Sequence, residues 1–170
     1  MRSIYAVACS AMVMLSMFTA CDNSNDSFEY SPEQLAYFEK NREYIREKKL
    51  EKDENGELVY HELVKYGDTT LYRIIDRKLD EPKYPTSDKV LEFNLEGHLI
   101  DGTNFQKKSV MKFSADQLIL GLRGVILDTS VGDSIEAILP ASLGYGYMNN
   151  GSIPAGSTLI FKYRVEEVKK

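Results

Sequence analysis

The sequence predicts an α+β protein in which one short helix packs against an antiparallel β-sheet, with a charged helix preceding both. Apolar and polar residues alternate along 91–96 and 159–166, and 134–139 has apolar residues on one side, as in strands with a buried face. Residues 118–127 carry Leu, Ile and Val at helical spacing. The length of 170 residues suits one core-bearing domain with extra segments rather than two full domains.

The composition excludes two kinds of function. Lys and Arg number 21 against 26 Asp and Glu, a formal net charge of −5, and no basic run stands apart from acidic residues. Nucleic acid is therefore not expected as a partner. The two histidines, His61 and His98, are far apart and have no cysteine near them. No metal site and no cofactor are predicted.

Residues 1–20 are predicted to be a signal peptide. Arg2 is the only charged residue before Asp22, and the run Ile4–Phe18 is dominated by apolar side chains. A membrane-spanning helix needs about 20 apolar residues, so this run is short for a permanent span. An uncleaved N-terminal anchor stays the alternative.

The end of this segment, Phe18-Thr19-Ala20-Cys21, resembles a bacterial lipobox, although Phe18 stands where Leu is more usual. The resemblance implies cleavage before Cys21, a lipid on Cys21 and a membrane-anchored protein. The polar stretch that follows makes 21–30 a tether. A chance cysteine after an ordinary signal peptide is the alternative, and it is disfavoured because the mature chain has no second cysteine for a disulfide.

Segment 31–55 is predicted to hold the charged N-terminal helix. Ser31 suits the N-cap, Pro32 the first helical position, and Gln34 can close a capping box. Opposite charges recur at helical pair spacing and apolar residues are sparse. The helix is therefore expected to end near Lys52, to be mostly solvated, and to be dispensable for folding of the rest.

Segment 56–88 is interpreted as a β-rich stretch followed by a connector. Strands are predicted at Leu58–Tyr66 and Thr70–Ile75, joined as a hairpin through Gly67-Asp68. Two prolines among charged residues then indicate the connector. The domain proper is expected to occupy 89–170.

Residues 89–168 contain five short motifs: Asp101-Gly102-Thr103-Asn104-Phe105; Phe113 with Gln117-Leu118-Ile119-Leu120-Gly121-Leu122; Ser130-Val131-Gly132-Asp133; Pro140-Ala141-Ser142-Leu143-Gly144-Tyr145-Gly146; and Ile153-Pro154-Ala155-Gly156-Ser157-Thr158-Leu159-Ile160-Phe161. In order and nearly in spacing, they resemble the FK506-binding-protein-type (FKBP-type) peptidyl-prolyl cis-trans isomerases. Each motif is weak alone, and five in order are specific. The resemblance implies a curved antiparallel sheet wrapped around one short helix. It also implies Xaa-Pro segments of exported polypeptides as partners, without a cofactor. A signal peptide and a charged helix before such a domain are similar to the lipid-anchored isomerases of Gram-negative envelopes, which implies a location at the outer membrane.

The resemblance further implies a pocket and the roles of nine residues in it. The catalytic positions are Tyr145, whose hydroxyl would bond a ligand carbonyl, Ile119, whose backbone N–H would be a second donor, and Phe105. The substrate-binding positions are Leu95, Gln106, Leu118, Leu122, Ile153 and Phe161. Judged on the residues alone, Leu118 and Phe161 are better explained as core residues, whereas Tyr145 between two glycines is the best functional candidate.

Three of these positions depart from the family pattern. Leu95 stands where the family has a tyrosine, Gln106 where it has an aspartate, and Leu122 where it has a tryptophan. The tyrosine and aspartate are normally hydrogen-bonded to each other, so losing both leaves no buried group unpaired. An isomerase with this sequence is expected to be slower than the family norm.

Three functions stay open at this point. The first is an envelope isomerase, with reduced activity, that assists the folding of exported proteins. The second is a peptide-binding or chaperone lipoprotein that keeps the pocket without turnover. The third is a structural lipoprotein that shares only the fold. The sequence predicts no particular oligomeric state.

Overall fold

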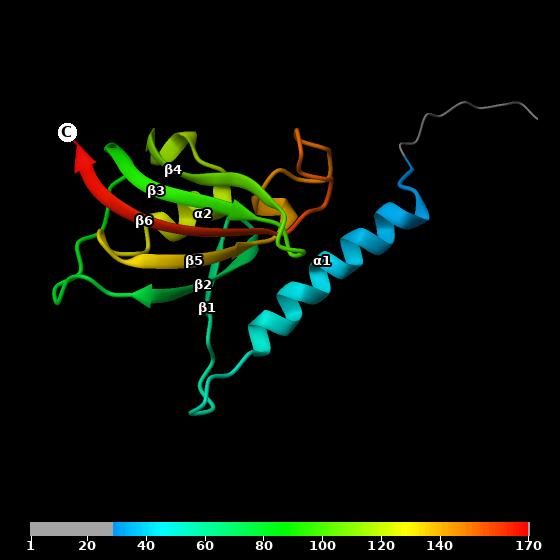
Figure 1. Cartoon of the computed structure of the whole chain (residues 1–170), viewed down its shortest axis with the longest axis horizontal. Helices are drawn as coiled ribbons and strands as arrows, with labels where there is room; N and C mark the ends of the chain where they lie inside the picture. The colour runs from blue at the N-terminus through cyan, green and yellow to red at the C-terminus, as the bar shows by residue number, and fades with distance from the viewer. Residues whose placement is uncertain (1–28, 170) are drawn as a thin grey trace, which may run out of the picture.

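The computed structural model describes residues 29–169 (Figure 1). The predicted signal peptide 1–20, Cys21 and most of the predicted tether lie outside the described residues. The described part contains two α-helices, two 3-10 turns and six strands, with these bounds: α1 Pro32–Leu50, β1 His61–Lys65, β2 Asp68–Asp76, β3 Val90–His98, β4 Asn104–Ser114, a 3-10 turn Ala115–Gln117, α2 Leu120–Ile126, β5 Ser134–Leu139, a second 3-10 turn Ala141–Leu143, and β6 Leu159–Lys169.

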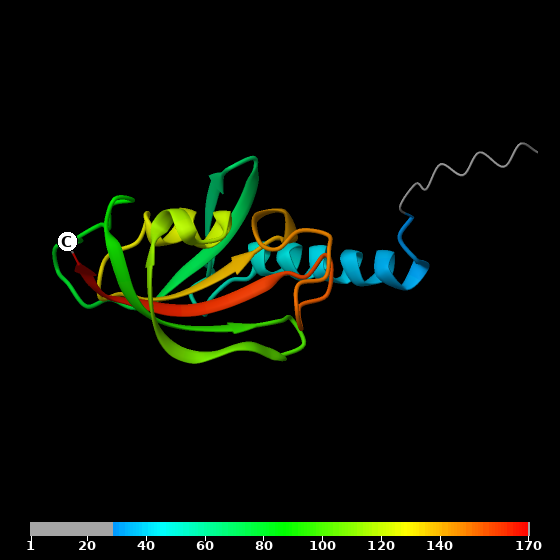
Figure 2. The ribbon, with the colours of Figure 1, turned by 90° about the horizontal axis from the view of Figure 1, so that it is seen from above.

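The six strands form one antiparallel sheet in the order β1-β2-β5-β6-β3-β4. The sheet bends around α2, which packs on its concave side (Figure 2). This arrangement confirms the predicted α+β class, a curved antiparallel sheet around one short helix with a charged helix before it. β3, β5 and β6 lie where the apolar periodicity placed them, because each buries one face against α2.

The hydrophobic core fills the space between α2 and the concave face of the sheet. Close approach of the two depends on Gly121, since a Cβ there would lie 2.6 Å from Cγ of Leu139 on β5. Both α2 and the alternating strands contribute, and the buried side chains include Leu91, Phe93, Leu95, Leu122, Val125, Ile126, Ile135, Leu139, Leu159, Phe161, Tyr163 and Val165. This layer supports the cavity described below.

The first hairpin differs from the prediction in its turn and in its place. Lys65 pairs with Asp68, so the turn is Tyr66-Gly67 rather than Gly67-Asp68, and both turn residues have positive φ, as a type I′ turn requires. β2 then pairs with β5. Segment 56–88 therefore supplies two strands to the same sheet as 89–170.

The edge strand β4 was not predicted, because its sequence does not alternate cleanly. Leu95 lies opposite Ser109 and Gly97 opposite Gln106, so two residues of β3 face three of β4. Such a bulge shifts the inward-facing positions by one residue and adds local bending. The strand thereby curls over the concave side of the sheet (Figure 2).

The N-terminal helix α1 has the predicted capping box, in which the backbone N–H of Ser31 donates to Gln34 Oε1 at 2.8 Å and Gln34 N–H donates to Ser31 Oγ at 3.3 Å. It ends at Leu50, earlier than predicted, because Glu51 adopts an extended backbone. Most of its surface is exposed, as expected, yet Phe38 and Asn41 are buried. Within residues 29–169, neither helix combines the length and apolar character needed to cross a bilayer.

Candidate active site

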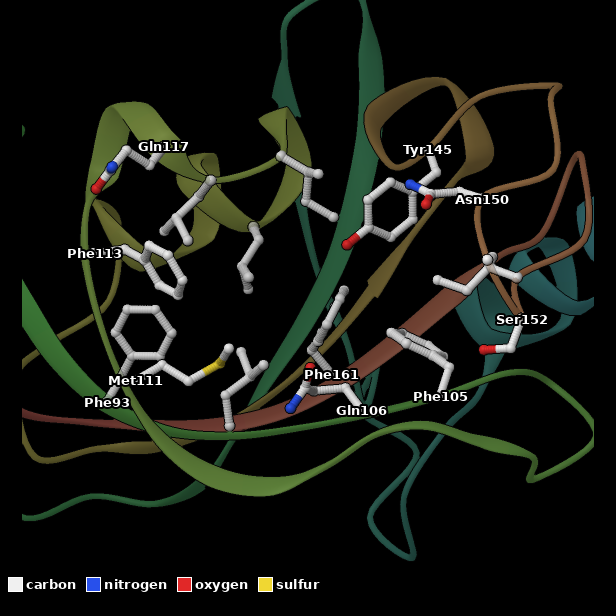
Figure 3. Close-up of a pocket in the computed structure, with 16 residues that line it drawn as sticks. Phe93, Phe105, Gln106, Met111, Phe113, Gln117, Tyr145, Asn150, Ser152 and Phe161 are labelled. Atoms are coloured by element: carbon white, nitrogen blue, oxygen red, sulfur yellow. The ribbon is translucent and has the colours of Figure 1, made fainter.

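A cavity of about 400 Å³ opens between α2, the strands β3, β4 and β6, and the loop that follows β5 (Figure 3). All nine residues singled out from the sequence line it, namely Leu95, Phe105, Gln106, Leu118, Ile119, Leu122, Tyr145, Ile153 and Phe161. The structure thus brings together positions that are spread over 67 residues of the chain. None of the described residues that line the cavity carries a charge.

Alternation along β3 and β6 builds the floor. Phe93 and Leu95 are two residues apart on β3, so they point to the same side, and Phe161 of β6 pairs with Gly97 of the same strand. Phe161 and Leu95, expected as core or binding residues, are both buried and still reach the cavity. The floor is therefore the exposed end of the hydrophobic core.

Phe105 closes the cavity at the start of β4. Its ring meets that of Phe161 edge to face, with centroids 5.5 Å apart and an interplanar angle of 89°. It occupies this place because Gly97 has no side chain, since a Cβ there would lie 2.5 Å from Cζ of Phe105. An edge-to-face pair of this kind holds both rings in a defined orientation.

The loop after β5 carries Tyr145, whose hydroxyl points into the cavity (Figure 3). The side chain is 39% exposed, and within residues 29–169 its hydroxyl donates no hydrogen bond to another protein group. Gly144 precedes it, and a Cβ there would lie 2.8 Å from Cδ1 of Leu159. The loop can therefore pack directly on β6 while Tyr145 faces a ligand.

Opposite Tyr145, Leu118 and Ile119 enter the cavity just before α2. Ile119 is the N-cap of this helix, and its carbonyl accepts from Arg123 N–H at 2.9 Å. Backbone N–H groups at a helix start have no partner within the helix. The geometry fits the predicted use of the Ile119 N–H as a donor, although the role itself stays a prediction.

The wall formed by β3 and β4 lacks the hydrogen-bonded acid and phenol that the resemblance implies. Leu95 is buried and apolar, and the amide of Gln106 donates to the carbonyl of Lys107 at 3.0 Å and to Ser109 Oγ at 3.2 Å. The side-chain amide of Gln106 is therefore hydrogen-bonded within the bulge of β4. No polar pair faces a ligand from this wall.

Seven further residues line the cavity without having been predicted as site residues, namely Phe93, Met111, Phe113, Gln117, Asn150, Gly151 and Ser152. Phe113 and Gln117 belong to the family motifs but were given no role. Phe93 could have been found, because it shares a strand face with Leu95. Gln117 is explained locally, since its Oε1 accepts from the backbone N–H of Ser114 at 2.9 Å. The residues 150–152 show no periodicity that would have marked them.

The chain thus folds as a curved sheet around one short helix, with a mainly apolar cavity between them. Comparisons with known proteins assign a chain of this kind to one family. The sequence profile of the family described as FKBP-type peptidyl-prolyl cis-trans isomerase matches residues 81–166, just over half of the chain. The chain belongs to this family.

Individual relatives agree with that assignment. FKBP-type peptidyl-prolyl cis-trans isomerase FkpA of Buchnera aphidicola is 27% identical over 149 residues, which covers 79% of this chain and 59% of the relative. FkpA of Escherichia coli K12 is 32% identical over 112 residues, 62% of this chain and 40% of the relative. The chain thus spans about three fifths or less of the length of these relatives. In fold, it is similar to a peptidyl-prolyl cis-trans isomerase of Pseudomonas syringae, with a TM-score of 0.68 at 20% identity, covering 84% of this chain and 99% of that one.

Proposed function

We propose that this chain catalyses cis-trans isomerisation at Xaa-Pro bonds of exported polypeptides and thereby assists their folding in the bacterial envelope. The observation that carries the proposal is the cavity, which is mainly apolar, has no charged residue in its lining and is faced by the Tyr145 hydroxyl. The uncatalysed reaction must cross a barrier of about 18–20 kcal/mol set by amide resonance. An enzyme for it needs neither a nucleophile nor a metal.

The residues of the cavity suit this chemistry. A twisted Xaa-Pro amide has lost resonance and part of its dipole, so apolar walls such as Phe105, Ile153 and Phe161 favour it over the planar amide. The Tyr145 hydroxyl donates a hydrogen bond to a substrate carbonyl, and the Ile119 N–H serves as a second donor. Catalysis is then the difference between binding the twisted and the planar forms.

We propose further that the rate is below the family norm. The β3–β4 wall presents Leu95 and a committed Gln106 in place of a polar pair. The same observation favours the second candidate, a peptide-binding lipoprotein that retains the pocket without turnover. Measuring exchange and binding on the same peptides separates the two.

The first prediction concerns Tyr145→Phe. Losing one hydrogen bond to substrate, worth about 0.5–1.5 kcal/mol, is expected to lower kcat/KM about two- to tenfold. Little stability should be lost, because the hydroxyl has no partner within the described residues. The measurement is magnetisation exchange by NMR on a set of Xaa-Pro peptides, with no coupled protease.

Tyr84→Phe is the matched control, because Tyr84 is an exposed tyrosine outside the cavity lining. It should leave the rate unchanged. If the unaltered protein shows no exchange above the uncatalysed rate for any peptide, the enzyme proposal fails. Peptide binding that is weakened by Tyr145→Phe would then support the binding candidate.

We also propose that the protein is anchored through a lipid on Cys21, with the outer membrane as its location. Support comes from the sequence that precedes Cys21. Cys21→Ala is expected to abolish incorporation of a labelled fatty acid and to release the protein from the membrane fraction, because one thiol carries the attachment. Labelling that persists in Cys21→Ala would refute the anchor.

A further inference from the structure

The loop 144–158 has two sides with different neighbours. Its inner side carries Tyr145 and Ile153, which line the cavity. Its outer side lies against the first half of α1, as Figure 1 shows. One segment therefore joins the proposed active site to the N-terminal helix.

The loop is held by local hydrogen bonds and has no regular secondary structure. It contains no helix or strand, and three of its glycines, Gly146, Gly151 and Gly156, have positive φ. Short backbone bonds tie it to itself, such as Gly156 N–H to the carbonyl of Gly146 at 3.0 Å. Segments rich in glycine and poor in regular structure open locally at low free energy unless neighbours hold them.

The aromatic ring of Phe38 supplies the main apolar contact from α1. Phe38 is 4% exposed and meets Tyr147 of the loop edge to face, with centroids 5.3 Å apart. Tyr30 covers its other side at 4.9 Å, and the Tyr30 hydroxyl donates to the carbonyl of Tyr147 at 3.3 Å. A side chain on Gly156 would overlap the Phe38 ring, so the ring rests directly on the loop backbone.

Polar contacts fix the end of the loop to the same helix. Asn41 Oδ1 accepts from Thr158 N–H at 2.7 Å, and the Thr158 hydroxyl donates to the Asn41 carbonyl at 3.1 Å. The hydroxyls of Tyr37 and Ser157 lie 2.9 Å apart. Phe38 and Asn41 are the only residues of α1 that are buried, and both contact this loop.

We propose that Phe38 is a positioning residue of the cavity, acting through the loop 144–158 on Tyr145 and Ile153. The N-terminal helix is then a structural part of the binding site rather than only a spacer. The catalytic consequence of this inference rests on the proposed isomerase function. Its structural consequence, the ordering of the loop, does not.

The experiment compares Phe38→Ala, the conservative Phe38→Leu and the control Leu35→Ala in the full chain. Leu35 lies on the same helix and is 51% exposed. Amide hydrogen exchange of residues 144–158 is expected to be about tenfold faster in Phe38→Ala, with β3 and β6 unchanged, because only the local opening becomes easier. Misplacement of the loop should lower kcat/KM about tenfold, mainly through KM. Phe38→Leu should recover most of both effects, and Leu35→Ala should change neither.

The outcomes distinguish this inference from the proposed function. Loop exchange that is unchanged in Phe38→Ala would overturn the inference, and so would equal acceleration in β3 and β6, which would indicate a loss of global stability instead. A kcat/KM that stays at the original value despite faster loop exchange would also overturn it. If the unaltered protein catalyses no isomerisation, the isomerase proposal fails. The positioning role of Phe38 is then decided by amide hydrogen exchange of the loop together with the dissociation constant for a peptide, which takes the place of KM.

Discussion

Replacing Leu95 with Tyr and Gln106 with Asp together is expected to raise the catalysed isomerisation rate about ten- to a hundredfold, since a hydrogen bond that acts on the strained amide is worth about 1–3 kcal/mol. The two positions suit the pair. Gly97 lies opposite Gln106, and Leu95 is two residues before Gly97 on the same strand face. A phenol at 95 can therefore reach a carboxylate at 106 diagonally across the strands.

The single variants are the controls for this prediction. Gln106→Asp alone places a carboxylate at the cavity without its phenol partner, which costs desolvation, so little or no gain is expected. The Asp can replace one lost contact by accepting from the Ser109 hydroxyl, which now accepts from Gln106 at 3.2 Å. A folded double variant that is no faster than the unaltered protein would show that the missing pair does not limit the rate.

Glu136→Ala is expected to lower the free energy of unfolding by about 3 kcal/mol, a large loss for a single substitution. Glu136 lies on the central strand β5 with its side chain only 8% exposed. Its Oε1 accepts from the Tyr60 hydroxyl at 2.6 Å and from Arg73 Nε at 2.8 Å. Removing Glu136 leaves the buried Tyr60 hydroxyl without a hydrogen-bond partner. Arg73 is 40% exposed, so water can hydrate it. The loss of stability is therefore expected at the lower end of the range for breaking a buried ion pair.

The measurement is urea unfolding followed by circular dichroism, because the chain has no tryptophan. Glu62→Ala is the matched control, since it breaks the exposed pair of Glu62 with Lys49 at 2.7 Å and should cost less than about 1 kcal/mol. Equal losses for the two variants would contradict a special role for the buried carboxylate.

The pH dependence of stability gives an independent check on Glu136. Burial raises the pKa of this carboxyl, but hydrogen bonds from Tyr60 and Arg73 and the charges of Arg73 and Lys162 outweigh burial and leave the pKa below its usual value. A carboxyl whose pKa is lowered by folding stabilises the protein above its unfolded pKa, and this contribution is lost as the pH falls through the folded pKa. Glu136→Gln should therefore lose less stability than the unaltered protein on acidification.

Features of this protein could be predicted from the sequence where the residues that determine them lie close together in the chain. The capping box of α1 rests on Ser31 and Gln34, which are three residues apart. The strands β3 and β6 show clean alternation because each has one face on the core and one toward solvent. The family motifs placed nine residues in one cavity, because strand pairing and short turns bring these motifs together in the folded chain.

Other features were decided only by contacts between distant segments. β4 could not be predicted because its bulge breaks the period of two. The hairpin of β1 and β2 appeared separate from the later strands because β5, the strand with which β2 pairs, follows 58 to 67 residues later in the chain. Phe38 looked like one of few apolar residues on a solvated helix. Its burial depends on Gly156, 118 positions later, whose positive φ and missing side chain leave the loop backbone open to the ring. Sequence patterns thus determined which elements form and which residues face the core. The packing of α1 against the loop 144–158 could not be predicted in this way. The free energy of that contact comes from surfaces that exist only after the chain has folded.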